Sequence, residues 1–454
     1  MVSPARKIAF DTLLRVEAEG AYASDVLHAE LGANVKSEDA ALATELTLGV
    51  LRWRGLLDFH LKRLLKKPAT RLDLGVTVAL RIGLYQLRFL QRIPARAAVN
   101  ESVELVKRAK KSSAASLVNA VLRKAANESL DHPERFVPTA LPLAHRLSIL
   151  HSHPRWMIER WLSRFGEART IALLQANNRA PQLSVAVYDS KQREEIVCEL
   201  KNAGFKVIDG HLLTTAFAVS GGNLARSEAF RSGRISIQDE ASQAIPLLLD
   251  VCAGDRVLDV CAAPGGKATH LARAVGSGLF VATDRHAHRL RAMNAQLERL
   301  GLKNVLLAEL DATKDLPFGT KFERILVDAP CSGTGTLARH PEIRWRLRPE
   351  QIDEFHRLQV AILGSALASL APGGTLVYST CSLEGEENQE VITETLGKND
   401  SVRRVPGGES IQNLERYLAP GVEARALVDE TGAFHTLPGE QQTDGFFAAI
   451  LEKE

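Results

Sequence analysis

Three short blocks of small and polar residues, each directly after an apolar run, constrain this chain most strongly. The blocks are residues 259–267 (DVCAAPGGK), 328–335 (DAPCSGTG) and 379–382 (STCS). The runs before them are rich in Val, Ile and Leu, which is typical of buried parallel strands. Helical patterns separate the runs, so the sequence predicts an α/β fold built from βαβ units. Ligands bind at the carboxyl ends of such strands, and we expect all three blocks to line one pocket there.

Length and cysteine usage narrow the class of protein. A chain of 454 residues predicts two or three domains. Its five cysteines include no Cys-x-x-Cys pair, which argues against a disulfide framework and against a zinc site, so we expect no metal. No apolar run approaches the ~18 residues of a membrane span, and the first residues lack the core of a signal peptide. We therefore expect a cytoplasmic monomer that does not bind a membrane.

Residues 1–130 are predicted to be all-helical and basic. Apolar residues recur at spacings of three and four within 5–20, 37–65, 72–90 and 97–127, as in helices with one buried face. This part has more basic than acidic residues, whereas the remainder is acidic overall. That asymmetry favours contact with a polyanion, although a solvated basic surface would give the same pattern. The helix pattern and the basic content resemble the NusB-like helical RNA-binding domain.

The rest of the chain divides at changes in pattern. Residues 131–150 contain three prolines and are interpreted as a linker. Residues 151–235 predict a small α+β module, with a strand at 183–189 followed by a helix and further short strands. Residues 236–454 carry the three blocks and form the predicted catalytic domain. Its last segments predict an antiparallel hairpin, so this domain has the strand pattern of a class I methyltransferase.

The loop after the first strand of this domain limits the choice of cofactor. It lacks Gly-x-Gly-x-x-Gly and also fails the P-loop pattern. What remains is a tight turn that opens a helix, whose N-terminus can hold a carboxylate. Asp284 and Asp311 end the next two strands, where carboxylates suit ribose hydroxyls and an adenine edge. Either Asp alone would be an ordinary turn residue, but together with the turn they predict S-adenosyl-L-methionine. The turn comprises Cys261, Ala262, Ala263, Pro264, Gly265, Gly266 and Lys267.

Two cysteines in the later blocks suggest covalent chemistry. Carbon 5 of cytosine is a poor nucleophile until a thiolate attacks C6 and turns the ring into an enamine. Such a reaction needs an activated Cys, an acid near N3 or N4, and a group that assists release. Cys381, Asp328 and Cys331 can supply these parts. Cys198 and Cys252 are instead interpreted as small buried residues, the commoner role of a free cysteine.

The three blocks, extended to DVCAAPGGKATH, DAPCSGTG and YSTCSLEGEEN, resemble the RNA cytosine-C5 methyltransferase family (the NOL1/NOP2/Sun group). The resemblance implies that Cys381 is the nucleophile and that Cys331 assists product release. It also implies cofactor contacts from residues 261–267 and from Asp284, Asp311 and Asp328. The catalytic residues it implies are Cys381, Cys331, Asp328 and Lys267.

A NusB-like domain ahead of such a catalytic domain resembles the bacterial members of this family that modify small-subunit ribosomal RNA. The resemblance thus implies a 16S rRNA (cytosine-C5)-methyltransferase with ribosomal RNA as its partner. Two alternatives stay open at this point, the same chemistry on transfer RNA and a non-catalytic RNA-binding factor. A basic cluster after the second block is expected to contact RNA phosphates, although a solvated turn also fits it. The cluster comprises Arg339, His340, Arg344 and Arg346.

Overall fold

The computed structural model describes residues 2–32, 35–65, 72–128 and 133–454. Contacts within the chain divide it into two units. The helical unit comprises Met1–Ala180 together with the short segment Leu337–Leu347. The sheet unit comprises Pro181–Thr336 and Arg348–Glu454. The segment 337–347, which the sequence places inside the catalytic domain, therefore makes its contacts with the helical unit.

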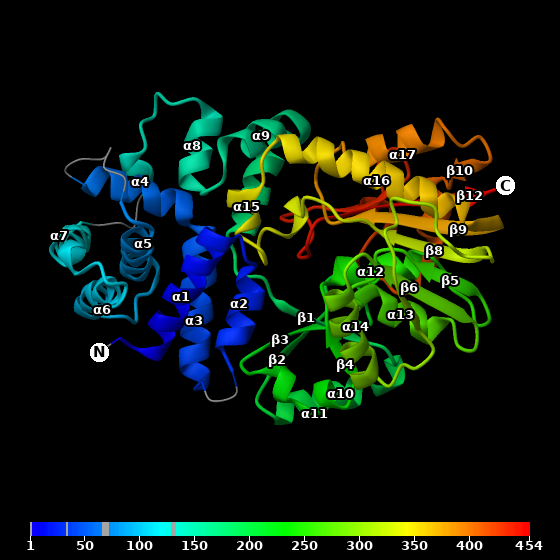
Figure 1. Cartoon of the computed structure of the whole chain (residues 1–454), viewed down its shortest axis with the longest axis horizontal. Coiled ribbons are helices and arrows are strands. Elements are labelled where there is room, and N and C mark those ends of the chain that lie inside the picture. Colours follow the sequence, from blue (N-terminus) through cyan, green and yellow to red (C-terminus); the bar gives the residue numbers. More distant parts are fainter. Residues whose placement is uncertain (1, 33–34, 66–71, 129–132) are drawn as a thin grey trace. The chain divides into compact units, whose positions relative to one another are not determined.

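Every element described in the helical unit is a helix, as predicted for its first 130 residues (blue to cyan in Figure 1). Its core lies between α1, α3 and α5, where Phe10, Leu13, Leu46, Val50 and Leu80 are almost fully buried. These side chains recur at helical spacing, so each helix turns one apolar face inward. The helices are α1 Pro4–Glu19, α2 Ala23–Glu30, α3 Ser37–Arg52, α4 Arg54–Leu64, α5 Leu74–Phe89, α6 Ala95–Arg108, α7 Ala115–Ala126, α8 Leu143–Leu150, α9 Arg155–Asn177 and α15 Ile343–Arg346.

Two long predicted helices are each divided in the structure. The range 37–65 breaks at Trp53, which leaves helical geometry while its ring stacks on Phe89 at 4.9 Å. The range 97–127 breaks after α6, where Lys110 takes a positive φ of 58°. Tertiary packing and one left-handed residue thus interrupt patterns that are continuous in sequence. The predicted linker is also partly wrong, because α8 lies within it.

A small α+β module opens the sheet unit, as predicted in kind, but residues 151–180 of the predicted range 151–235 belong to the helical unit. Its strands are β1 Leu183–Val187, β2 Lys206–Asp209, β3 Ala216–Ser220 and β4 Ile235–Ile237, in the antiparallel order β2-β3-β1-β4. Val185, Phe217 and Ile235 form one apolar face, which packs on Ile196 and Leu200 of α10 (Arg193–Asn202). The helix α11 (Glu228–Arg231) contacts α10 and β4 beside them.

A larger, mostly parallel sheet forms the rest of the unit. Its strands are β5 Arg256–Asp259, β6 Leu279–Asp284, β7 Leu306–Glu309, β8 Phe322–Asp328, β9 Leu370–Thr380, β10 Val402–Arg404, β11 Phe434–Thr436 and β12 Phe446–Lys453. The order is β10-β12-β9-β8-β5-β6-β7, with β11 paired to β12. Strands β5 to β9 pair in parallel, whereas β12 runs antiparallel to both β9 and β11. The predicted C-terminal hairpin is therefore confirmed.

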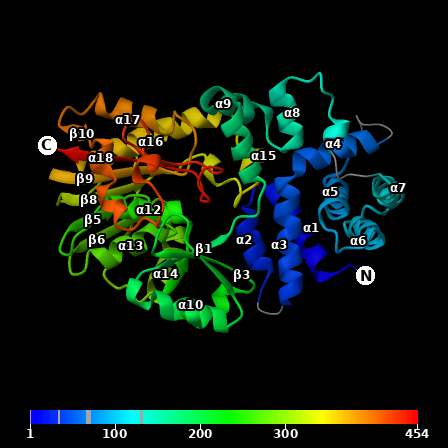
Figure 2. The ribbon, with the colours of Figure 1, turned by 180° about the vertical axis from the view of Figure 1, so that it is seen from behind.

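Helices cover both faces of this sheet, which is why its strands are almost continuously apolar (Figures 1 and 2). Val257, Leu326 and Val377 belong to the core on one face, which includes residues of α12 (Glu240–Leu248) and α13 (Gly266–Ala274). Their neighbours Leu258 and Ile325 belong to the core on the other face, which includes residues of α16 (Glu350–Ala368) and α17 (Gln389–Leu396). The helix α14 (Ala287–Arg299) contacts β6 and β7.

The strand order creates one switch point beside the first parallel strand. From β5 the chain first builds β6 and β7 on one side, then returns to place β8 and β9 on the other. Loops that leave β5 and β8 therefore diverge, and the crevice between them is the usual ligand site of such sheets. All three sequence blocks lie at this edge. Two short helices, α18 (Gly407–Ser410) and α19 (Gln412–Glu415), lie between β10 and β11 in sequence. No helix in the described ranges is long and apolar enough to cross a bilayer.

Candidate active site

Three aspartates end neighbouring parallel strands at the switch point. Asp259 ends β5, Asp284 ends β6 and Asp328 ends β8. Parallel pairing in register brings these strand ends to one edge of the sheet. Sequence reasoning selected Asp284 and Asp328, and the structure places both there.

Asp259 opens the first block, but the sequence interpretation gave it no role of its own. Its side chain is only 1% exposed, and among the described residues no other side chain hydrogen-bonds to its carboxylate, which has only the Cys261 backbone as a nearby donor. Burial and the nearby Asp328 carboxylate raise the pKa of Asp259 well above its usual range. A buried carboxyl group with no side-chain partner is costly, so this position suits a ligand that brings a cation or a donor. Its place at a strand end, like that of Asp284, is the signal that could have revealed it.

The loop between β5 and α13 is built so that its backbone can approach a ligand closely. Ala262 and Ala263 are buried, with 7% and 4% exposure, and offer only methyl groups. Gly265 has a φ of +101°, and a Cβ there would lie 2.8 Å from Cγ of Met293. Glycine is therefore required at this position on two counts, backbone conformation and space. The helix α13 begins at the next residue, so its free N–H groups open toward this loop.

Asp284 and Asp311 have different surroundings. Asp284 is 3% exposed, accepts a hydrogen bond from the His286 amide at 3.0 Å and pairs with Arg289 at 3.1 Å. Asp311 is more exposed and accepts hydrogen bonds from the Thr313 hydroxyl at 2.7 Å and amide at 3.2 Å. These two bonds lower the pKa of Asp311, as in an ordinary turn. Asp284 thus has the geometry of a buried acceptor, while cofactor binding by Asp311 stays a prediction.

Lys267 connects the first block to the second. Its Nζ lies 2.6 Å from Oδ2 of Asp328 and 4.8 Å from the centre of the Phe446 ring. The other oxygen of Asp328 accepts a hydrogen bond from the Ser379 hydroxyl at 2.9 Å. One carboxylate is therefore fixed by a residue from each of the other two blocks. Such charge-assisted bonds hold a side chain more firmly than neutral ones.

The two cysteines of the second and third blocks face each other. Sγ of Cys331 lies 3.3 Å from Sγ of Cys381. Contact with Cys381, together with burial, raises the pKa of Cys331 well above its usual value. Cys331 therefore keeps its proton and can donate it toward Cys381. The prediction that Cys198 and Cys252 are buried is wrong, because both residues are exposed.

Two further polar residues surround the cysteine pair and had no predicted role. Glu387 and Gln359 are fully buried and hydrogen-bond to each other at 3.1 Å. Both also contact the Cys331 loop. Glu387 stands in the EGEEN stretch that supported the family resemblance, but nothing in its sequence surroundings distinguishes it from the adjacent acids.

The predicted RNA-binding cluster lies within the segment that belongs to the helical unit. Arg344 is fully buried, and burial lowers the pKa of its guanidinium. Its donors reach four main-chain carbonyls and one side-chain amide oxygen. The prediction that Arg344 contacts an RNA phosphate is therefore wrong. The acceptors are the carbonyls of Arg52, Ser152, Asn177 and Leu337 and Oδ1 of Asn178.

The other members of that cluster are partly exposed. Arg346 donates to the carbonyls of Gly20 and Ala21 and lies over the Tyr22 ring at 4.5 Å. Burial lowers the pKa of His340, so its imidazole is neutral at physiological pH. RNA contacts by Arg339, His340 and Arg346 stay predictions.

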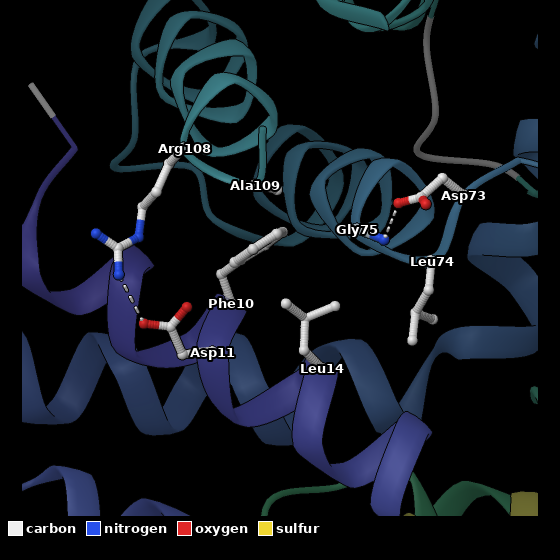
Figure 3. A pocket seen from close by; sticks show the side chains of 8 residues that line it. All are labelled: Phe10, Asp11, Leu14, Asp73, Leu74, Gly75, Arg108 and Ala109. Carbon is white, nitrogen blue, oxygen red and sulfur yellow. Dashed lines mark hydrogen bonds and ion pairs between the residues drawn. The ribbon is translucent and has the colours of Figure 1, made fainter. Parts of the chain in front are cut away.

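A separate hollow of about 520 Å³ lies in the helical unit (Figure 3). Phe10 and Leu14 of α1 form its apolar side. Each of its charged groups already has a partner, because Arg108 pairs with Asp11 at 3.2 Å and Asp73 accepts a hydrogen bond from the Gly75 amide at 2.9 Å and pairs with Lys111. The chemistry-bearing residues are all elsewhere, at the switch point of the sheet.

A doubly wound sheet with an antiparallel final strand, and a small-residue turn after its first strand, define a class I methyltransferase fold. Models of known families agree with this. The description "16S rRNA methyltransferase RsmB/F" matches residues 246–452, the NusB family matches 3–127, and an RsmF/B-like ferredoxin-like domain matches 153–222.

Related proteins match over nearly the whole chain. The probable ribosomal RNA small subunit methyltransferase B of Bacillus subtilis is 33% identical, over 99% of this chain and 98% of its own length. The ribosomal RNA small subunit methyltransferase B of Erwinia tasmaniensis is also 33% identical, with the same coverage. Among solved structures, PH0851 is 26% identical with a TM-score of 0.82, covering 100% of this chain and 99% of its own. The chain belongs to the RsmB/F methyltransferase family and carries that family's NusB domain.

Proposed function

We propose that this protein methylates C5 of a cytosine in 16S (small-subunit) ribosomal RNA through a covalent bond between Cys381 and C6 of the base. The observation that carries the proposal is the 3.3 Å separation of the Cys331 and Cys381 sulfur atoms at the ligand edge of the sheet. Two thiols at this distance, beside an aspartate held by a lysine, supply the parts of a covalent route. The names of the relatives, which are ribosomal RNA methyltransferases, support the choice of substrate.

The residues take distinct roles in this route. The Cys381 thiolate bonds to C6, which makes C5 nucleophilic. Asp328 hydrogen-bonds the N3 or N4 edge of the base, while Lys267 holds Asp328 in place. After C5 has been methylated, its proton must leave and the bond from Cys381 to C6 must break. As that bond breaks, Cys331 gives its proton to the sulfur of Cys381, and the thiolate it leaves accepts the proton from C5, so both cysteines end as thiols.

The site also suits S-adenosyl-L-methionine as the methyl donor. The donor is cationic at sulfur and at its amino group, and the buried carboxyl of Asp259 offers a partner for such a charge. Residues 261–267 and Asp284, Asp311 and Asp328 are the proposed contacts. When bound, S-adenosyl-L-methionine supplies an electrophilic methyl group. The role of this chain's residues is to hold that group beside the cysteine pair and to exclude water.

RNA contacts are proposed for the helical unit and for Arg339, His340 and Arg346. An RNA of the small subunit places the reaction in the cytoplasm, and we expect the protein to act as a monomer. A target base inside folded RNA must leave its stack to reach a cysteine, which costs a few kcal/mol. Phosphate contacts away from the cysteines can offset that cost.

The test uses unmodified small-subunit RNA and S-adenosyl-L-methionine with a labelled methyl group. The wild type should place label on C5 of one cytosine. Cys381→Ala should show neither turnover nor adduct, whereas Cys331→Ala should accumulate an adduct that survives a denaturing gel. Cys252→Ser, at an exposed site elsewhere, is the matched control and should behave as wild type.

Three outcomes would contradict the proposal. Adduct with Cys381→Ala and none with Cys331→Ala would reverse the two roles. Label on transfer RNA in place of small-subunit RNA would keep the chemistry and change the substrate. No label on cytosine in any RNA would leave a non-catalytic RNA-binding protein.

A further inference from the structure

We propose that Glu387 is a positioning residue that fixes both cysteine-bearing loops and so sets the distance between Cys331 and Cys381. The inference rests on the proposed function, because the distance matters only if both thiols act on one base. Glu387 lies between β9, which ends at Thr380, and α17, which begins at Gln389. Its side chain is fully buried.

The carboxylate of Glu387 binds the residue that follows each cysteine. Oε2 accepts a hydrogen bond from the amide of Ser332 at 2.8 Å, and Oε1 accepts from the hydroxyl of the same residue. Oε1 also accepts from the hydroxyl of Ser382 at 2.5 Å. Ser332 follows Cys331 and Ser382 follows Cys381, so one side chain joins the two loops next to the reacting sulfur atoms.

Gln359 holds the same loop from its other side. Its Nε2 donates to Oε2 of Glu387 at 3.1 Å and to the carbonyl of Pro330 at 2.9 Å. Pro330 and Ser332 flank Cys331, so the backbone on both sides of this cysteine is held by one connected pair of side chains. Gln359 is fully buried on α16, which fixes the pair relative to the sheet.

The backbone of Glu387 is itself anchored. Its carbonyl accepts a hydrogen bond from the Tyr378 hydroxyl at 2.7 Å. The next residue, Asn388, donates to the carbonyl of Ser382 at 2.9 Å and accepts from the Thr380 hydroxyl at 2.6 Å. The carboxylate thus extends from a fixed main chain and can transmit that position to both loops.

Energetics favour a positioning role over a purely structural one. Every donor to Glu387 described above is a neutral group, and burial raises the pKa of Glu387. A buried carboxylate compensated only by neutral donors is a costly way to hold a loop, and a packed apolar residue would often stabilise the fold more. Unlike an apolar side chain, the carboxylate also orients the two loops, since its two oxygens accept four hydrogen bonds from fixed directions.

Two substitutions separate the geometry from the charge. Glu387→Gln keeps an acceptor for the Ser332 amide and for Gln359, and turns its NH₂ group toward the two serine hydroxyls, which can accept. Glu387→Ala removes all of these contacts. We expect Glu387→Gln to form adduct at a rate within about threefold of wild type. Glu387→Ala should be at least tenfold slower, with an unchanged KM for RNA. Glu390→Ala, an exposed neighbour on α17, is the matched control.

The distance between the cysteines can be measured without RNA or cofactor. The azo oxidant diamide takes two electrons and two protons from a pair of thiols, leaving a disulfide and the corresponding hydrazine. Sulfur atoms 3.3 Å apart need little movement to reach the ~2.05 Å of a disulfide. Peptide mass spectrometry of the full chain then gives the rate of Cys331–Cys381 coupling. We expect wild type, Glu387→Gln and Glu390→Ala to couple rapidly, and Glu387→Ala at least tenfold more slowly.

The two assays distinguish the possible failures. If Glu387→Ala couples its cysteines more slowly than wild type, but wild type forms no adduct with RNA containing 5-fluorocytosine, whose C5 carries no removable proton, the proposed function fails while the positioning role stands. If Glu387→Ala couples its cysteines and forms adduct as wild type does, the positioning role is overturned. Should Glu387→Ala not fold, Ser382→Ala removes one donor alone. Coupling and adduct formation at the wild-type rate in that folded variant would equally overturn the proposal.

Discussion

Lys267 Nζ and Asp328 Oδ2 lie 2.6 Å apart, which ties the loop after β5 to the end of β8. The lysine side chain is 9% exposed and the Asp328 side chain 31%, so the pair is partly screened by water. The first and second blocks therefore share one ion pair. Asp328 also accepts a hydrogen bond from Ser379, but among the described residues Lys267 is its one cationic partner.

Lys267→Met should slow methyl transfer without weakening RNA binding. The variant keeps most of the side-chain volume and removes a charged hydrogen bond, worth about 1.5–3 kcal/mol. Single-turnover transfer from labelled cofactor should therefore fall by about 10- to 150-fold, while the KM for RNA stays constant. Lys314→Met, at an exposed lysine, is the control. An unchanged transfer rate in Lys267→Met would show that Asp328 needs no such support.

Arg344→Ala should destabilise the protein strongly. The guanidinium satisfies four carbonyls and one amide oxygen inside the helical unit, and the Ala variant leaves these acceptors buried without a donor. The expected loss is about 3 kcal/mol or more in the free energy of unfolding, measured by urea denaturation. Arg344→Lys should recover only part of the lost free energy of unfolding, because a single ammonium cannot donate to as many acceptors as the planar guanidinium does. Arg348→Ala, at an exposed position, should change stability by less than about 0.5 kcal/mol.

Arg344 and Glu387 show where sequence reasoning fails. Both lie in stretches with several similar residues, RHPEIRWRLR and EGEEN. Which arginine or glutamate is buried depends on the path of the loop, and that path is set by residues distant in sequence. Trp53 is comparable, since its contact with Phe89 interrupts a continuous helical pattern.

The sheet and its ligand edge were predictable for the opposite reason. Parallel strands buried on both faces must be apolar throughout, and polar residues directly after them mark the carboxyl ends. Cys331, Cys381, Asp284 and Asp328 carry that signal in their immediate neighbours. Asp259 carries it too, but its almost complete burial is visible only in the structure.

His270→Gln should alter how stability depends on pH. Burial, with Arg273 and Lys267 nearby, lowers the pKa of His270 to about 3. The unfolded chain takes up this proton below a pH of about 6.5, whereas the folded chain does not, so wild type loses stability as the pH falls. The unfolding free energy of wild type minus that of His270→Gln should therefore fall on acidification, by at most about 1.4 kcal/mol per pH unit. Urea denaturation at pH 7.5 and pH 5.5 measures it. A difference, wild type minus variant, that stays constant or rises would contradict the lowered pKa of His270.

The exposed basic residues Lys110, Arg123 and Lys124, around α6 and α7, should contribute to RNA affinity by neutralising phosphates. Each neutralised phosphate releases counterions, so every basic side chain removed should reduce the slope of log affinity against log salt by about 0.7–0.9. Replacing all three by Gln in the full chain should raise the KM for RNA and flatten that slope by up to about 2 to 3. The chemical step should not change, because these residues belong to the helical unit and the cysteines to the sheet unit. Arg291, Lys303 and Lys398 are exposed in the sheet unit, and their triple Gln variant carries the same change in charge. If both triple variants flatten the slope equally, net charge alone controls RNA binding and the helical unit has no special part in it.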